Sequence, residues 1–175
     1  MPWPISAGWC TLLAMPDSTR APGPDHPGVV IFPPLLFASC LLAGLGLHWL
    51  WPLGTGIPWL PRAVVAGLAL MAAAAFGLGG ERALHGAGTN VRPDLPTTAI
   101  VTGGIYRYTR NPLYLALLSV YTAVALLANS LWPFALWSVL LPVLVTGIVA
   151  REERYLEAKF GEPYLAYTAR VRRWL

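Results

Sequence analysis

Residues 131–160 read LWPFALWSVLLPVLVTGIVAREERYLEAKF, and this stretch decides the fold class of the chain. Residues 131–150 carry no charged side chain, whereas residues 151–154 are Arg, Glu, Glu and Arg. An uncharged apolar run of that length is enough for a helix to cross the ~30 Å hydrocarbon core of a bilayer. The sequence therefore predicts a membrane-spanning helix with a cluster of charges at its exit, which can continue as a helix through residue 160.

The rest of the chain has the same character. Hydrophobic residues make up 56% of the 175 residues and charged residues 11%, with a mean hydropathy of +0.57. A soluble domain of this size cannot bury so much apolar surface. Further apolar segments cover residues 29–53, 62–84 and 112–128. We therefore expect an all-α polytopic membrane bundle of about four transmembrane helices, with a cytoplasmic cofactor loop and a C-terminal helix.

Turn residues separate these segments. Residues 53–58 contain two glycines and a proline, and Asn129-Ser130 forms a short polar break. Pro112 occupies a favourable first helical position. Pro142 lies inside the last apolar run, where the missing N–H should kink the helix.

Basic residues concentrate in the loop at 86–111 and in the tail after residue 150. Because cytoplasmic loops are enriched in Arg and Lys, the loop, the tail and the N-terminus are expected in the cytoplasm, as in a bacterial inner-membrane protein. The formal net charge of +4 is scattered and forms no basic stripe, so no nucleic-acid partner is expected. The two cysteines and three histidines show no metal-ligand spacing, so no metal is expected.

The N-terminal region differs from the rest. Residues 16–28 are rich in Pro and Gly, so residues 1–28 are interpreted as a flexible tail, with residues 29–175 as the membrane-embedded domain. No basic segment precedes an apolar run here, so a cleaved signal peptide is not expected. Met15 is an alternative start.

A second polar cluster precedes the third apolar segment. Gly103 and Gly104 permit close backbone approach to a ligand, and the exposed N–H groups before Pro112 can hold a carboxylate. The alternative is an ordinary loop whose arginines meet lipid headgroups. The loop matches neither a phosphate-binding loop nor a dinucleotide-binding turn.

Glu152 and Glu153 offer carboxylates at the exit of the last helix. Adjacent helical residues point about 100° apart, so at most one of them faces a given site squarely. A carboxylate there can bind an ammonium or a sulfonium group. The alternative is a solvated helix end with pairing between successive turns. We expect Glu153 to contribute more to ligand affinity than Glu157, which lies one turn further into water.

Two motifs then carry a family resemblance. They are Gly104-x-Tyr106-Arg107-x-x-Arg110-Asn111-Pro112-x-Tyr114 and Glu152-Glu153-x-x-Leu156-x-x-x-Phe160-Gly161-x-x-Tyr164-x-x-Tyr167. In this order and spacing, residues 86–175 resemble the isoprenylcysteine carboxyl methyltransferases and the related phospholipid methyltransferases. The resemblance implies a methyltransferase that binds S-adenosylmethionine at the cytoplasmic membrane face.

The resemblance also implies roles for individual residues. The cofactor-binding residues would be Ile100, Val101, Thr102, Gly103, Gly104, Tyr106, Arg110, Asn111, Pro112, Tyr114, Glu152 and Glu153. The catalytic residues would be Arg110 or Arg151, orienting an acidic acceptor, and Glu152 or Glu153, accepting a proton from an amine.

The acceptor is expected to be lipophilic. Thr98 stands where the family often has His, and Ile148 and Val149 stand where prenylcysteine enzymes tend to carry Arg. These differences leave the acceptor open between a prenylated cysteine, a lipid headgroup and another lipophilic molecule. Two alternative functions are an NADPH-dependent membrane reductase of the steroid-reductase type and a non-enzymatic membrane scaffold.

Overall fold

The computed structural model describes residue 28, residues 31–90 and residues 97–175, and every element in these parts is helical. The predicted N-terminal tail therefore lies outside the described residues except for Gly28, as does Arg92 of the long loop. The elements are α1 (Pro33–Leu50), α2 (Trp59–Gly86), η1 (Gly104–Arg107), α3 (Pro112–Leu127), α4 (Trp132–Ala135), α5 (Trp137–Pro142), η2 (Val143–Val149), α6 (Ala150–Phe160) and α7 (Glu162–Thr168).

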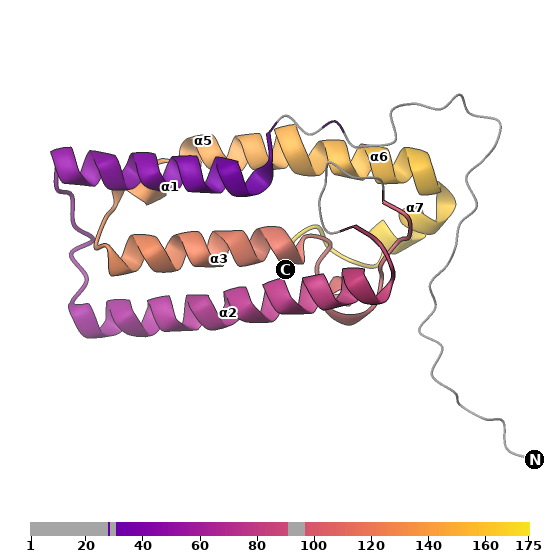
Figure 1. Ribbon diagram of the computed structural model, residues 1–175, viewed down its shortest axis with the longest axis horizontal. Helices are drawn as coiled ribbons and strands as arrows, with labels where there is room; N and C mark the ends of the chain where they lie inside the picture. Colours follow the sequence, from indigo (N-terminus) through magenta and orange to yellow (C-terminus); the bar gives the residue numbers. More distant parts are fainter. Residues whose placement is uncertain (1–27, 29–30, 91–96) are drawn as a thin grey trace, which may run out of the picture.

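The predicted helical membrane bundle is confirmed. Within the described residues, three helical stretches are long and apolar enough to cross a membrane: Pro33–Leu50, Trp59–Gly86 and Trp132–Phe160. The fourth apolar helix, α3, has 16 residues and a length of about 24 Å at 1.5 Å per residue. Figure 1 shows α3 between α2 on one side and α1 with α5 on the other, where neighbouring helices cover it.

Small residues bring α2 and α3 together. Ala66 and Ala123 are fully buried in one core cluster between these helices. A Cβ atom at Gly80 would lie 2.9 Å from Leu113 Cδ2, so only glycine fits this contact without a shift. On the outer surface of α2, large apolar side chains are exposed, among them Trp59, Leu60 and Met71. An apolar surface of this kind is suited to lipid.

The core on the other side of α3 joins α1, α3 and the last long helix. Phe37 packs edge-on against Tyr121, with ring centroids 6.4 Å apart. The buried Tyr121 hydroxyl donates a hydrogen bond of 2.7 Å to the carbonyl of Pro133. Leu140 and Ile148 complete this core.

The two predicted turns meet at the end of the bundle far from the long loop. Asn129 adopts a φ of 52°, the left-handed region that asparagine tolerates better than most residues. Its side-chain oxygen accepts hydrogen bonds from the Thr55 N–H (3.1 Å) and the Thr55 hydroxyl (2.8 Å). The polar break after α3 is therefore also a link between the two turns.

The last long helix changes type along its length. The chain ends α5 at Pro142, passes through the π-helical segment η2 and resumes as α6. Pro142 lacks an N–H, and Thr146 donates its hydroxyl to the Pro142 carbonyl (2.7 Å). The sequence predicted a kink at Pro142; the structure has a π segment immediately after it.

Candidate functional site

A cavity of about 830 Å³ lies at the loop end of the bundle. Its walls come from the start of α1, the second half of α2, the segment before η1, and the helices α3, α6 and α7. One part of the wall is polar and contains Arg110, Asn111 and Glu152. The part that follows α2 and α3 towards the middle of the bundle is apolar, as at Leu70 and Val120. The cavity can therefore hold a polar group and an apolar chain at the same time.

Glu152 is the carboxylate that reaches this cavity from α6. The hydroxyl of Tyr114, on α3, donates a hydrogen bond of 2.6 Å to Glu152 Oε1. Tyr114 is 7% exposed and lines the same cavity, so its ring fixes the position of the carboxylate. The second carboxylate oxygen is not used in this bond and can accept a hydrogen bond from a ligand.

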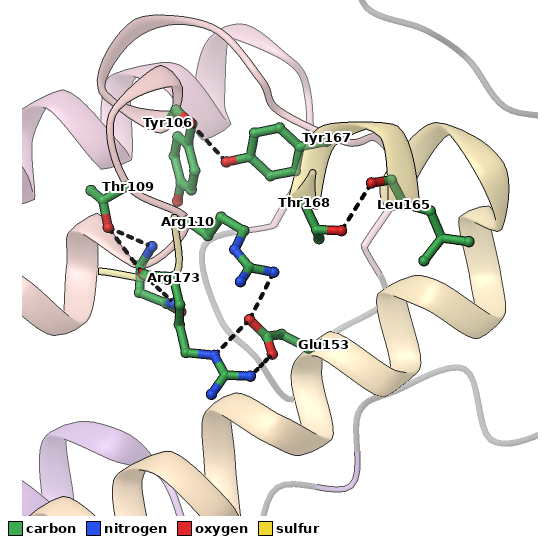
Figure 2. A network of polar contacts seen from close by, with 9 residues as sticks. Tyr106, Thr109, Arg110, Glu153, Leu165, Tyr167, Thr168 and Arg173 are labelled. Carbon is green, nitrogen blue, oxygen red and sulfur yellow. Dashed lines mark hydrogen bonds and ion pairs between the residues drawn. The ribbon is translucent and has the colours of Figure 1, made fainter. Parts of the chain in front are cut away.

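Glu153 points elsewhere, to a cluster of two arginines (Figure 2). Its Oε1 forms an ion pair with Arg110 Nη1 at 3.1 Å and accepts a hydrogen bond of 3.1 Å from Arg173 Nε. Arg173 Nη2 donates to the other oxygen at 2.5 Å. The side chains of Arg110 and Glu153 are only 16% and 17% exposed. Glu153 does not line the cavity, whereas Arg110 does.

The tail after α7 holds the turn that carries Arg110. The Arg110 N–H donates to the carbonyl of Arg172 (3.1 Å), and the Asn111 side-chain amide donates to the carbonyl of Arg173 (2.9 Å). The buried Thr109 hydroxyl donates to the same Arg173 carbonyl at 3.2 Å. Pro112 then begins α3, so this turn and the cavity-facing residues of α3 are fixed together.

The segment before α3 approaches the cavity in part. Ile100 and Val101 line it, whereas Thr102, Gly103 and Gly104 do not. Gly104 adopts a φ of 59°, which favours glycine, and begins the short helix η1.

Two tyrosines fix this segment to α7. Tyr106 lines the cavity, and its carbonyl accepts a hydrogen bond of 2.7 Å from the Tyr167 hydroxyl, which also lines the cavity. Burial raises the pKa of both hydroxyls well above the ordinary tyrosine value, so both stay protonated donors.

Arg151 is separate from this arrangement. Its side chain is exposed and donates to the carbonyl of Gly28 at 3.0 Å. It does not line the cavity, although it precedes Glu152 in the chain. Among the described residues, no group of three or more His, Cys, Asp or Glu side chains is arranged to hold a metal ion.

The sequence model of the family described as phospholipid methyltransferase matches residues 61–163, which is more than half of the chain. The chain belongs to this family. A Haemophilus influenzae protein described as an uncharacterized protein is 47% identical over 66 residues, which are 36% of this chain and all of the relative. No solved structure matches the chain. The family is one of membrane methyltransferases, in agreement with the apolar helices.

The family match contains much of the cavity wall, from α2 through Glu152. It does not contain α1, Tyr164, Tyr167 or Arg173. Sequence reasoning did not assign Arg173 to the site, because its charge in the tail was interpreted only as a topology signal. The two tyrosines were part of the second motif, which was the available signal for their place in the cavity.

The apolar part of the cavity wall is also not predicted by the sequence motifs. Ala73, Ala74 and Gly77 of α2 line the cavity opposite Ala116 and Leu117 of α3. In the sequence, small residues on a membrane helix such as α2 indicate close helix packing. The same small side chains leave open space where the facing helix does not fill it.

Proposed function

We propose that the protein transfers a methyl group from S-adenosylmethionine to a lipophilic acceptor at the cytoplasmic face of a bacterial inner membrane. One observation carries this proposal: a single cavity has Glu152, Tyr114 and Arg110 in its polar part and an apolar extension between α2 and α3. Along α2 the cavity wall extends from Leu70 to Leu84, roughly 21 Å of helix. That length accommodates a polar cofactor and part of a hydrocarbon chain.

The charges of the cavity wall fit the cofactor. Among the described lining residues, Glu81 and Glu152 are acidic and Arg110 is the single cationic side chain. An acidic wall favours a ligand with a sulfonium and an ammonium group. The buried Nε of Arg110 has no hydrogen-bond partner among the described residues, and an orphaned donor of this kind suits an anionic ligand group such as the cofactor carboxylate.

Specific roles follow for the predicted residues. Glu152 binds the cofactor ammonium, with Tyr114 holding its carboxylate in place. Glu153 acts indirectly, through Arg110. The other cavity-lining residues proposed to hold the cofactor are Ile100, Val101, Tyr106, Asn111 and Pro112. Thr102, Gly103 and Gly104, which follow Val101 in the chain outside the cavity wall, are proposed to add backbone contacts.

The protein's part in the reaction is alignment and protection from water. When bound, S-adenosylmethionine supplies a methyl group on a positively charged sulfur, which is already a good leaving group. The buried tyrosines and the aliphatic wall exclude water and hold the acceptor in line. Arg110 orients an acidic acceptor, and Glu152 accepts a proton when the acceptor is an amine. Arg151 is the alternative orienting group, from outside the cavity wall.

A reductase is disfavoured by the same charges. NADPH carries three phosphate groups, and the described wall offers them a single arginine.

Calorimetry on the detergent-solubilised protein is expected to show binding of S-adenosylmethionine or its demethylated product in preference to NADPH. Incubating membranes with methyl-labelled cofactor should give a labelled lipid or lipophilic small molecule by mass spectrometry. Binding of NADPH alone would favour the reductase, and binding of neither ligand would favour a scaffold.

The apolar wall predicts a variant with altered acceptor choice. Gly77 lines the cavity, and a Cβ atom there would meet only Ala116 Cβ at an ordinary 3.5 Å. A leucine at this position should occupy part of the apolar extension. We expect Gly77→Leu to reduce methylation of long-chain acceptors more than that of short-chain acceptors, measured over a series that differs only in chain length.

Gly67→Leu is the matched control, because Gly67 lies on the same helix with nothing within 4 Å of its Cβ position and away from the cavity. An equal loss for all chain lengths in Gly77→Leu would mean that the extension does not hold the acceptor chain.

The membrane orientation has its own test. Figure 1 places the N-terminal end of α1, the C-terminal end of α2 and helices α6 and α7 at the same end of the bundle. Because Arg107, Arg110 and the tail arginines lie there, we propose that this end is cytoplasmic. Reporter fusions after residue 130 should behave as periplasmic, and fusions after residue 175 as cytoplasmic. The reverse pattern would place the cavity on the other side.

A further inference from the structure

The ion cluster of Arg110, Glu153 and Arg173 contains two positive charges and one negative charge. Arg173 binds both carboxylate oxygens of Glu153, with one guanidinium nitrogen on each. Arg110 Nη1 lies 3.1 Å from Oε1, the oxygen that Arg173 Nε also contacts. A forked arginine–carboxylate pair is stronger than a single contact, so Glu153 is engaged mainly by Arg173.

This arrangement leaves Arg110 incompletely neutralised. Arg110 lines the cavity, and its buried Nε has no partner among the described residues. If Arg173 were absent, both oxygens of Glu153 would be available to Arg110 alone, as a neutral pair. The charge that the cavity presents at Arg110 therefore depends on a side chain outside the cavity wall.

The position of Arg173 is well fixed for such a role. Its carbonyl accepts hydrogen bonds from Asn111 and Thr109, on either side of Arg110. The neighbouring Val171 is buried in the core cluster of α7, and Trp174 packs against the core that joins α1 and α3. The tail thus brings the guanidinium of Arg173 to Glu153 from a region beyond the family match.

We propose that Arg173 is a positioning residue for ligand binding: by holding Glu153, it keeps the Arg110 guanidinium available to a carboxylate group of the ligand in the cavity. This inference rests on the proposed function, in which that carboxylate belongs to S-adenosylmethionine. Arg173 lies outside both sequence motifs, and its effect is expected on the binding of the ligand carboxylate.

The test compares two ligands that differ in one group. S-adenosylmethionine and its decarboxylated form share the sulfonium and ammonium groups, and only the first has a carboxylate. In Arg173→Gln, the affinity for S-adenosylmethionine should fall on the order of tenfold, as expected for coupling within one salt-bridge network. The affinity for the decarboxylated ligand should not fall. The readout is the ratio of the two dissociation constants by calorimetry.

Arg172→Gln is the matched control. It removes the same charge one residue away, and the Arg172 side chain is exposed, with its backbone carbonyl making the contact to Arg110. This variant should leave the ratio unchanged. Arg173→Lys keeps the charge without the fork and should give an intermediate ratio.

The double variant Glu153→Gln with Arg173→Gln guards against a folding defect. Here Arg110 again lacks an anionic partner, so the preference for the carboxylate-bearing ligand should return even though Arg173 is missing. Equal losses for both ligands in Arg173→Gln, or no recovery in the double variant, would reduce Arg173 to a structural contact of the tail. If the unmodified protein binds neither ligand, the proposed function itself fails, which is a distinct result.

Discussion

Replacing Glu152 by glutamine is expected to lower the affinity for S-adenosylmethionine by roughly ten- to a hundredfold. The carboxylate lines the cavity and is held by the Tyr114 hydroxyl at 2.6 Å, so it is positioned before the ligand arrives. A hydrogen bond to a charged group contributes about 1.5–3 kcal/mol, which corresponds to that range of affinity. Glutamine keeps the size of the side chain and removes the charge. Calorimetry with the demethylated cofactor measures the effect without turnover.

Glu157→Gln is the control for this experiment, because Glu157 is exposed on the same helix, and an exposed charge is worth ~0–1 kcal/mol. The sequence-based expectation that Glu153 outweighs Glu157 is measured in the same series. From the structure we expect that, among the three glutamates, replacing Glu152 lowers the cofactor affinity most. Equal affinities for the Glu152 and Glu157 variants would remove Glu152 from the site.

The second large effect concerns stability. Gly44 of α1 is buried against α4, and a Cβ atom there would lie 2.8 Å from the backbone nitrogen of Pro133 and 2.9 Å from its Cα. Backbone atoms cannot move aside as a flexible side chain can. We expect Gly44→Ala to destabilise the fold by about 1–3 kcal/mol, the usual cost of overpacking. For a chain of this size the midpoint of thermal unfolding should then fall by roughly 2–12 °C.

Gly46→Ala provides the comparison on the same helix. Nothing lies within 4 Å of a Cβ at Gly46, and alanine is the better helix former, so no loss of stability is expected. Thermal unfolding of both variants in one detergent measures the difference. A Gly44 variant as stable as the Gly46 variant would mean that α1 and α4 are not in close contact.

Much of the fold could be predicted from the sequence, because long apolar segments and a few turn residues determine it. The third predicted helix, 112–128, matches α3 within a residue, since Pro112 favours the first turn and Asn129 the break after it. The division of the last helix into α4, α5, η2 and α6 could not be predicted. Pro142 signals a disturbance, but the form it takes depends on packing against α1 and α3.

The region of the site could be predicted from the sequence, but the roles of its individual residues could not all be predicted. The two motifs indicate which segments meet. Of the twelve residues that the resemblance assigns to the cofactor, eight line the cavity: Ile100, Val101, Tyr106, Arg110, Asn111, Pro112, Tyr114 and Glu152. Which glutamate faces the cavity could not be read from the spacing alone. The part played by Arg173 requires the tail to fold back, and a positive charge after the last helix looks the same in sequence whether it meets lipid or a carboxylate.

The π segment Val143–Val149 determines in which direction around the helix axis the side chains of α6 point. A π turn holds one residue more than an α turn, so residues beyond it are rotated by about 100° relative to an uninterrupted α-helix. Adjacent glutamates are separated by that same angle. The side chains before and after the π segment therefore face directions that are set separately. Before it, the helix directs side chains to α1 and α3. After it, the helix directs Glu152 to the cavity and Glu153 to the arginines.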